Sequence, residues 1–182
     1  MIFEHGFLHC DPHPGNLLAR RCPESGLFQL VLLDHGLCRE LPPAFRANYA
    51  RLWCALLGGD AAAGRAAARG LGVRDEDYEA LSLLLVFRSA DSRAPAGTQM
   101  STAEREAVRE RFKNTRAVDV NEFLQRLPRE MLLVFRTWAL VRSLNRELGG
   151  SARNRFRIIA DAAARCAFTL LPDEEGVGGA AT

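Results

Sequence analysis

Lysine is almost absent from this chain. Of its 24 basic residues, only Lys113 is a lysine, and the other 23 are arginines. An arginine carries a permanent, fork-shaped charge, whereas a lysine carries a compact charge that can titrate. A site that needs a lysine to contact phosphate therefore has one candidate. The formal net charge is only +2 and the arginines form no dense tract, so the sequence does not predict nucleic acid as a partner.

Cysteine pairs at the spacing of redox or zinc motifs are also missing. The five cysteines are odd in number and no Cys-x-x-Cys occurs, which predicts reduced thiols in an intracellular compartment. The first residues lack the pattern of a signal peptide. No apolar run reaches the roughly 18 residues that a membrane-spanning helix needs.

The length of 182 residues and the hydrophobic content of 48% are those of one globular domain with its own core. Residues 2–8 are expected to end a buried helix that is broken at Gly6. Short apolar runs over 17–19 and 28–33, separated by the Pro- and Gly-containing turn 23–26, predict a β-hairpin. Most of the chain after Pro42 has helical spacing, so the predicted fold class is α+β, predominantly α.

The helical part divides at glycines, prolines and capping residues. One expected helix ends at Gly58, and the next runs from a cap at Asp60 to Gly70. Another is expected to begin at Asp119 or Asn121. The remaining expected helices cover 75–87, 103–112, 128–149 and 153–171. Arginines on the helix after Pro128, Arg136 among them, are expected to face solvent. The side chains expected to face the core are Phe45, Tyr49, Leu52, Trp53, Leu56, Leu81, Leu84, Leu85, Met131, Val134, Trp138, Val141 and Leu148.

Two short segments carry the chemistry that the sequence predicts. Residues 9–16 read His-Cys-Asp-Pro-His-Pro-Gly-Asn, which places Asp11 five residues before Asn16, and residues 32–36 read Leu-Leu-Asp-His-Gly around Asp34. Kinases use one carboxylate to orient the acceptor, and one amide and one carboxylate to hold Mg²⁺ against the phosphates of ATP. Each of the three residues alone is also an ordinary turn residue. Their joint spacing favours Asp11 as catalytic and Asn16 and Asp34 as Mg²⁺ and nucleotide ligands.

The histidines and glycines around these segments have structural roles in this interpretation. His9 and His13 are expected to support the loop, together with Gly15 and Gly36. All four histidines lie within the first 35 residues, which raises the alternative of a zinc or iron site. The spacing His-Cys-Asp-x-His matches no helical ligand pair, and two prolines stiffen the loop, so a transition-metal site is not predicted.

These two segments resemble the UbiB-type, or aarF-domain (ADCK), atypical kinases. The resemblance rests on Asp-Pro-His-Pro-Gly-Asn at 11–16. The Asp-His-Gly at 34–36 is most similar to the mitochondrial branch of the family. The similarity to that branch continues through residues 127–133 and 142–149. It implies a protein-kinase-like C-lobe, with a short β-hairpin carrying the catalytic loop and the Asp-x-Gly segment. It further implies binding of Mg²⁺ and ATP, a mitochondrial location, and a link to coenzyme Q or lipid homeostasis.

The resemblance also implies a division of the chain. Residues 1–171 are expected to form the C-lobe, with the catalytic loop and metal-binding hairpin in 1–41, a helical body in 42–171 and a disordered tail in 172–182. The family's Lys-x-Gly-Gln helix and strand lysine are not found, so an N-lobe is expected to be absent and this chain alone to be largely inactive.

Further expectations concern activity and partners. A segment of only five residues separates Gly36 from the helix near Pro42, which is too short for the peptide-binding segment of a protein kinase. One alternative function is a small-molecule phosphotransferase of the aminoglycoside or choline kinase type, although the Pro-His-Pro insertion argues against it. The other is a non-catalytic helical scaffold, or a truncated fragment, at a mitochondrial membrane. The expected partners are a nucleotide and a lipid or membrane surface.

Overall fold

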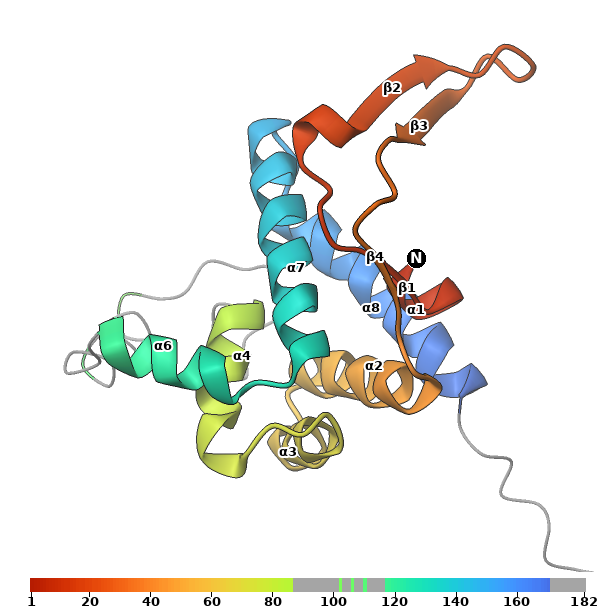
Figure 1. Cartoon of the computed structure of the whole chain (residues 1–182). Helices are drawn as coiled ribbons and strands as arrows, with labels where there is room; N and C mark the ends of the chain where they lie inside the picture. Colours follow the sequence, from red (N-terminus) through yellow and green to blue (C-terminus); the bar gives the residue numbers. More distant parts are fainter. Residues whose placement is uncertain (87–101, 103–105, 107–109, 111–116, 171–182) are drawn as a thin grey trace, which may run out of the picture.

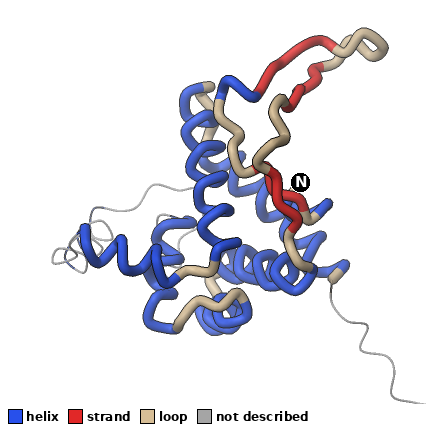
Figure 2. Tube along the Cα trace, in the orientation of Figure 1, coloured by secondary structure: helices blue, strands red, loops and turns tan. Residues whose placement is uncertain are grey.

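The computed structural model describes residues 1–86, 102, 106, 110 and 117–170. Within these residues the chain is mainly helical, and its few strands all lie in the first 40 residues (Figures 1 and 2). The helix expected over 103–112 and the tail expected over 172–182 lie outside the described residues. No helix in the described part is long and apolar enough to cross a bilayer.

The strands form two separate antiparallel pairs. β1 (Phe7–His9) pairs with β4 (Cys38–Glu40), and β2 (Leu17–Arg21) pairs with β3 (Phe28–Leu32). The β2–β3 pair is the predicted hairpin, and it projects away from the helices (Figure 1). The expectation of a helix over residues 2–8 is wrong at its end. The helix α1 (Ile2–His5) ends at Gly6, which has φ of 65°, and the backbone then continues as β1 because β4 offers it a partner.

The two helices after the strands follow the predicted pattern closely. α2 (Pro43–Gly58) buries Phe45, Tyr49, Leu52 and Trp53 on one face, as the helical spacing predicts. α3 (Ala61–Gly70) begins after Asp60, whose side chain accepts a hydrogen bond from the backbone N–H of Ala63 at 2.9 Å.

The long C-terminal helices close the core against α2. In α7 (Arg129–Glu147) and α8 (Ala152–Thr169), Trp138 and Phe156 lie against Trp53 of α2, with ring centroids 5.5–6.4 Å apart. The predicted core stripe of α7 is correct at Met131 and Val134. It is wrong at its C-terminal end, where Val141 and Leu148 are exposed while Leu144 between them is half-buried.

The region between α3 and α7 is fixed by charged groups as well as by apolar packing. The 3₁₀ turn η2 (Asp75–Asp77) leads directly into α4 (Tyr78–Val86), where Leu84 is exposed and not buried as expected. α6 (Ala117–Arg126) begins before both predicted capping residues. Arg126 donates to the Asp77 carboxylate at 2.7 Å, and Arg74 donates to it at 3.0 Å. Burial raises the pKa of Asp77, but these hydrogen bonds outweigh it and hold the pKa below its ordinary value.

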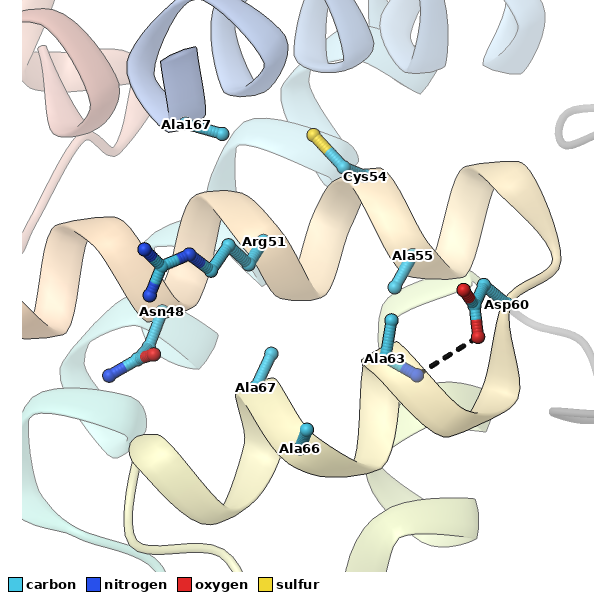
Figure 3. Close-up of a pocket in the computed structure, with 9 residues that line it drawn as sticks. All are labelled: Asn48, Arg51, Cys54, Ala55, Asp60, Ala63, Ala66, Ala67 and Ala167. Carbon is cyan, nitrogen blue, oxygen red and sulfur yellow. Dashed lines mark hydrogen bonds between the residues drawn. The ribbon is translucent and has the colours of Figure 1, made fainter. Parts of the chain in front are cut away.

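A groove of about 550 Å³ lies between α2, α3 and the end of α8 (Figure 3). Small side chains make the groove, because five alanines stand where larger residues would fill the space. None of the predicted site residues lines it. Its lining residues are Asn48, Arg51, Cys54, Ala55, Asp60, Ala63, Ala66, Ala67 and Ala167.

Candidate functional site

The predicted catalytic loop connects β1 to β2. His9 ends β1 and is buried, and its Nδ1 accepts a hydrogen bond from the backbone N–H of Asp11 at 3.2 Å. Since Nδ1 is the acceptor, the neutral imidazole carries its proton on Nε2, which faces the carbonyl of Leu33 at 3.3 Å. His9 therefore links the loop to the segment that precedes Asp34.

Asn16 makes the second link between the two predicted segments. Its side-chain Nδ2 donates to the backbone carbonyl of Asp11 at 3.1 Å, and the backbone carbonyl of Asn16 accepts from the backbone N–H of Leu33 at 2.8 Å. A third link closes the other end of the loop, where the N–H of Cys10 donates to the carbonyl of Leu37 at 2.9 Å. The residues around Asp11, Asn16 and Asp34 are thus held beside one another.

Asp34 lies at the exposed start of the turn that follows β3. It has φ of 50°, a left-handed conformation that aspartate tolerates better than most residues. Its Oδ1 accepts a hydrogen bond from the backbone N–H of Gly36 at 3.1 Å, so the side chain stabilises its own turn. A Cβ on Gly36 would lie 3.1 Å from this oxygen, which makes the turn tight at that position.

His13 and Gly15 shape the middle of the loop. His13 precedes the 3₁₀ turn η1 (Pro14–Asn16), and its Nδ1 accepts from the N–H of Gly15 at 3.1 Å. A Cβ on Gly15 would lie 2.9 Å from Cε1 of this ring, so a larger residue would displace His13. The other ring nitrogen of His13 lies 3.9 Å from Oδ2 of Asp11.

α7 contributes two contacts that local sequence patterns do not predict. Arg136 donates to Oδ1 of Asp11 at 2.9 Å, and Oγ1 of Thr137 lies 3.1 Å from the carbonyl of His9. Arg136 is exposed, as expected, and it also contacts Asp11, which the helical pattern did not predict. Its partner lies 125 residues earlier in the chain, and no spacing rule connects positions so far apart.

The donor atoms around the loop fit a hard divalent cation. The amide nitrogen of Asn16 is committed to Asp11, which leaves its side-chain oxygen as a ligand. One carboxylate oxygen of Asp34 accepts from Gly36, which leaves the other. Carboxylate and amide oxygens are ligands that Mg²⁺ prefers, and few protein ligands are needed when phosphates and waters complete the coordination.

Known proteins resemble this chain along most of its length. A family model described as the ABC1 atypical kinase-like domain matches residues 1–67. The chain is 40% identical over 154 residues to AarF domain-containing protein kinase 1 of Xenopus tropicalis. The aligned region covers 84% of this chain and 29% of that protein. It is 38% identical over 154 residues to the protein of the same name from Mus musculus, with coverage of 82% and 28%.

A third relative is AarF domain-containing kinase 1 of Drosophila melanogaster, which is 34% identical over 151 residues, with coverage of 81% of this chain and 29% of the relative. No solved structure matches the chain significantly. The chain thus spans less than a third of the length of these relatives. The matched domain contains the whole loop from His9 to Asn16 and the turn at Asp34, and the chain belongs to the family of ABC1 (AarF domain-containing) atypical kinase-like proteins.

Proposed function

We propose that this chain supplies the Mg²⁺- and ATP-binding segment of a kinase-like protein and adopts the arrangement of a protein-kinase C-lobe. The activity of the whole protein would be ATP hydrolysis or phosphoryl transfer. One observation carries the proposal: the side chain and backbone of Asn16 connect the Asp11 loop to the strand that ends before Asp34. Phosphoryl transfer needs a carboxylate and two metal ligands on one side of the nucleotide, and this connection brings their segments together.

The proposed roles follow from the atoms that remain available. Asp11 orients the attacking hydroxyl or water and accepts its proton. Asn16 and Asp34 hold Mg²⁺ through their side-chain oxygens. When bound, the cation neutralises charge on the phosphates. His9 and His13 support the loop, and each does so through an Nδ1 that accepts a backbone N–H.

Arg136 adds a positive charge at the position where phosphates would approach Asp11. Its guanidinium has five N–H donors, and the 2.9 Å contact with Asp11 engages one of them. The chain has a single lysine, Lys113, which lies outside the described residues. We therefore assign to Arg136 part of the phosphate binding that kinases usually obtain from lysine.

The test is calorimetric titration of Mg²⁺-ATP into the purified chain and its Asp34→Asn variant. Asparagine keeps the oxygen that accepts from Gly36 and tolerates the left-handed backbone, so the variant should fold and lose only the metal-binding charge. The matched control is Asp161→Asn, an exposed aspartate on α8. We expect Mg²⁺-dependent binding that disappears in Asp34→Asn and persists in the control. Equal affinity in Asp34→Asn and the unaltered chain would refute the proposed metal site.

The acceptor in the proposed reaction is a small molecule or water and not a peptide. Residues Cys38–Glu40 are paired as β4, and α2 begins at Pro43, so little chain is left between them to hold a peptide substrate. The proposal extends to coenzyme Q or lipid homeostasis in mitochondria, for which the support is the family resemblance. Coenzyme Q content and lipid composition in cells that carry the full-length gene with Asp34→Asn would test this extension.

A further inference from the structure

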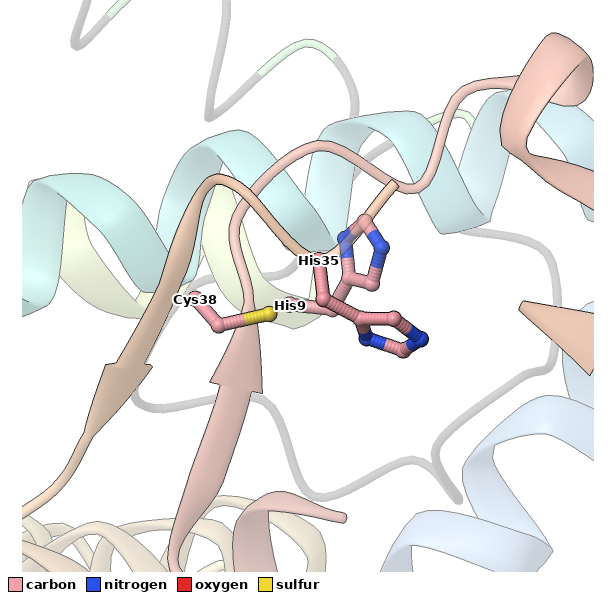
Figure 4. A group of neighbouring side chains, drawn as sticks. All are labelled: His9, His35 and Cys38. Atoms are coloured by element: carbon pink, nitrogen blue, oxygen red, sulfur yellow. The ribbon is translucent and has the colours of Figure 1, made fainter. Parts of the chain in front are cut away.

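Two histidines and a cysteine converge beside the catalytic loop. His9 on β1, His35 in the turn after β3 and Cys38 on β4 each offer a ligand atom, and these atoms all lie within 4.8 Å of one another (Figure 4). His9 and Cys38 are direct partners in the β1–β4 register, and directly opposed residues of an antiparallel pair project to the same face. His9 is buried, Cys38 is half-buried and His35 is exposed, so the cluster opens to solvent on one side.

The donor atoms of this cluster differ in kind from those of the Mg²⁺ site. Two imidazole nitrogens and one thiolate sulfur suit Zn²⁺ and similar transition metals, whereas Mg²⁺ takes oxygen ligands. Bonds of about 2.0–2.3 Å to zinc require the three atoms to approach more closely than 4.8 Å. The exposed His35 and the half-buried Cys38 have the freedom to do so, and water can take a fourth position.

We propose that His9, His35 and Cys38 form a binding site for a thiophilic divalent cation such as Zn²⁺, and that its occupancy competes with the hydrogen bond that fixes Asp11. On binding, the thiol of Cys38 releases its proton to solvent and its sulfur donates an electron pair to the cation. The binding step is independent of the proposed function. Its consequence for Asp11 matters to activity only if that function is correct.

The competition follows from the two nitrogens of His9. If Nδ1 binds the cation, its lone pair is no longer available to the N–H of Asp11. If Nε2 binds the cation, the proton of the neutral ring must move to Nδ1, which then cannot accept a hydrogen bond. Either ligation therefore removes the 3.2 Å contact between His9 and the N–H of Asp11. The cluster thus couples a transition metal to the conformation of the catalytic loop.

The first experiment is titration of Co²⁺, a spectroscopic substitute for Zn²⁺, into the purified, reduced chain without Mg²⁺. We expect a sulfur-to-cobalt charge-transfer band that excess Zn²⁺ removes. Cys38→Ser should lose the band, and His35→Gln should weaken the affinity at least about tenfold, the scale of loss when a metal-site partner is removed. Absence of the band, or its survival in Cys38→Ser, overturns the proposal.

Two matched controls separate this cluster from casual binding. Cys22→Ser removes another half-buried thiol, and His5→Gln removes an exposed imidazole. Both variants should keep the band at full intensity. If Cys22→Ser abolishes it, the sulfur ligand is not Cys38 and the assignment is wrong.

Hydrogen exchange tests the coupling to the loop separately from activity. Zn²⁺ should accelerate exchange of the Asp11 amide in the unaltered chain and have no such effect in Cys38→Ser. If the cobalt band forms fully and the exchange rate of the Asp11 amide stays constant with Zn²⁺, the competition is refuted.

Discussion

Gly64, in the first half of α3, has the tightest environment of the glycines in the described part of the chain. A Cβ built at this position would lie 2.0 Å from Oη of Tyr78 and 2.9 Å from its Cζ. Tyr78 begins α4 and is almost fully buried, and the guanidinium of Arg65 lies 4.8 Å from the centre of its ring. Gly64→Ala therefore tests whether α3 and α4 pack as closely as the structure describes.

Two opposing effects set the magnitude. Alanine is favoured over glycine inside a helix by about 1 kcal/mol. An ordinary contact distance is at least 3.4 Å, so the ring or the helix would have to move by 3.4 − 2.0 = 1.4 Å. Overpacking of this kind costs about 1–3 kcal/mol, and a rigid aromatic ring favours the upper end. The expected net loss for Gly64→Ala is about 2 kcal/mol, or a Tm lower by about 4–8 °C in a chain of this size.

Thermal unfolding followed by circular dichroism measures this change, with Gly58→Ala as the control. Gly58 is the exposed last residue of α2, and a Cβ there meets nothing within 4 Å. Gly58→Ala should leave the Tm unchanged or raise it slightly. Adding Tyr78→Phe removes the closest atom, so a double-mutant cycle should show that this change recovers part of the loss in Gly64→Ala. A Tm for Gly64→Ala at or above that of the unaltered chain would refute the packing argument.

Three further predictions concern charge. The pKa of Asp77 is held below its ordinary value of 3.8, so the stability that its charge adds is present above pH 3.8 and is lost as the pH falls through the lower folded-state pKa. The free energy of unfolding, measured as a function of acid pH, should therefore depend less on pH in Asp77→Asn than in the unaltered chain. Arg136→Ala should change the free energy of unfolding by no more than about 1 kcal/mol, since the ion pair with Asp11 is largely exposed. The same variant should weaken Mg²⁺-ATP binding about threefold or more by calorimetry, and unchanged affinity would contradict the role of Arg136 in phosphate binding. Hydrogen bonds, mainly from Ser25, lower the pKa of Cys22, while burial raises the pKa of Cys10 and Cys166. Mass spectrometry should therefore find Cys22 alkylated faster than the two buried thiols, and the reverse order would contradict these pKa directions.

Local patterns predicted much of the fold because local chemistry decides it. Asp60 caps α3, as expected for an aspartate before an alanine-rich run, and Gly58 and Gly59 end α2 where the apolar stripe ends. The hairpin of β2 and β3 follows from two apolar runs around a Pro- and Gly-containing turn. In each case the deciding residues lie within a few positions of one another.

The remaining features depend on partners that are distant in sequence. β1 and β4 are three residues each, and neither shows a clear alternating pattern; each becomes a strand because the other lies beside it. The contact of Arg136 with Asp11 depends on how α7 packs across the loop. Likewise, His9 and Cys38 become neighbours only through strand pairing, so cysteine spacing gave no sign of the cluster that they form with His35.

The hydrogen bonds at both ends of the catalytic loop have a consequence for its dynamics. The bonds from Cys10 to Leu37 and from Leu33 to Asn16 join the loop and the Asp34 turn into a closed ring of backbone. Neither segment can separate from the other without breaking one of these bonds. The two segments should therefore open as one cooperative unit with a shared free energy of local unfolding. Substitutions at Arg39 or Glu40, which pair with Leu8 and Phe7 of β1, would then change the free energy of local unfolding of the Asp11 loop without contacting a ligand.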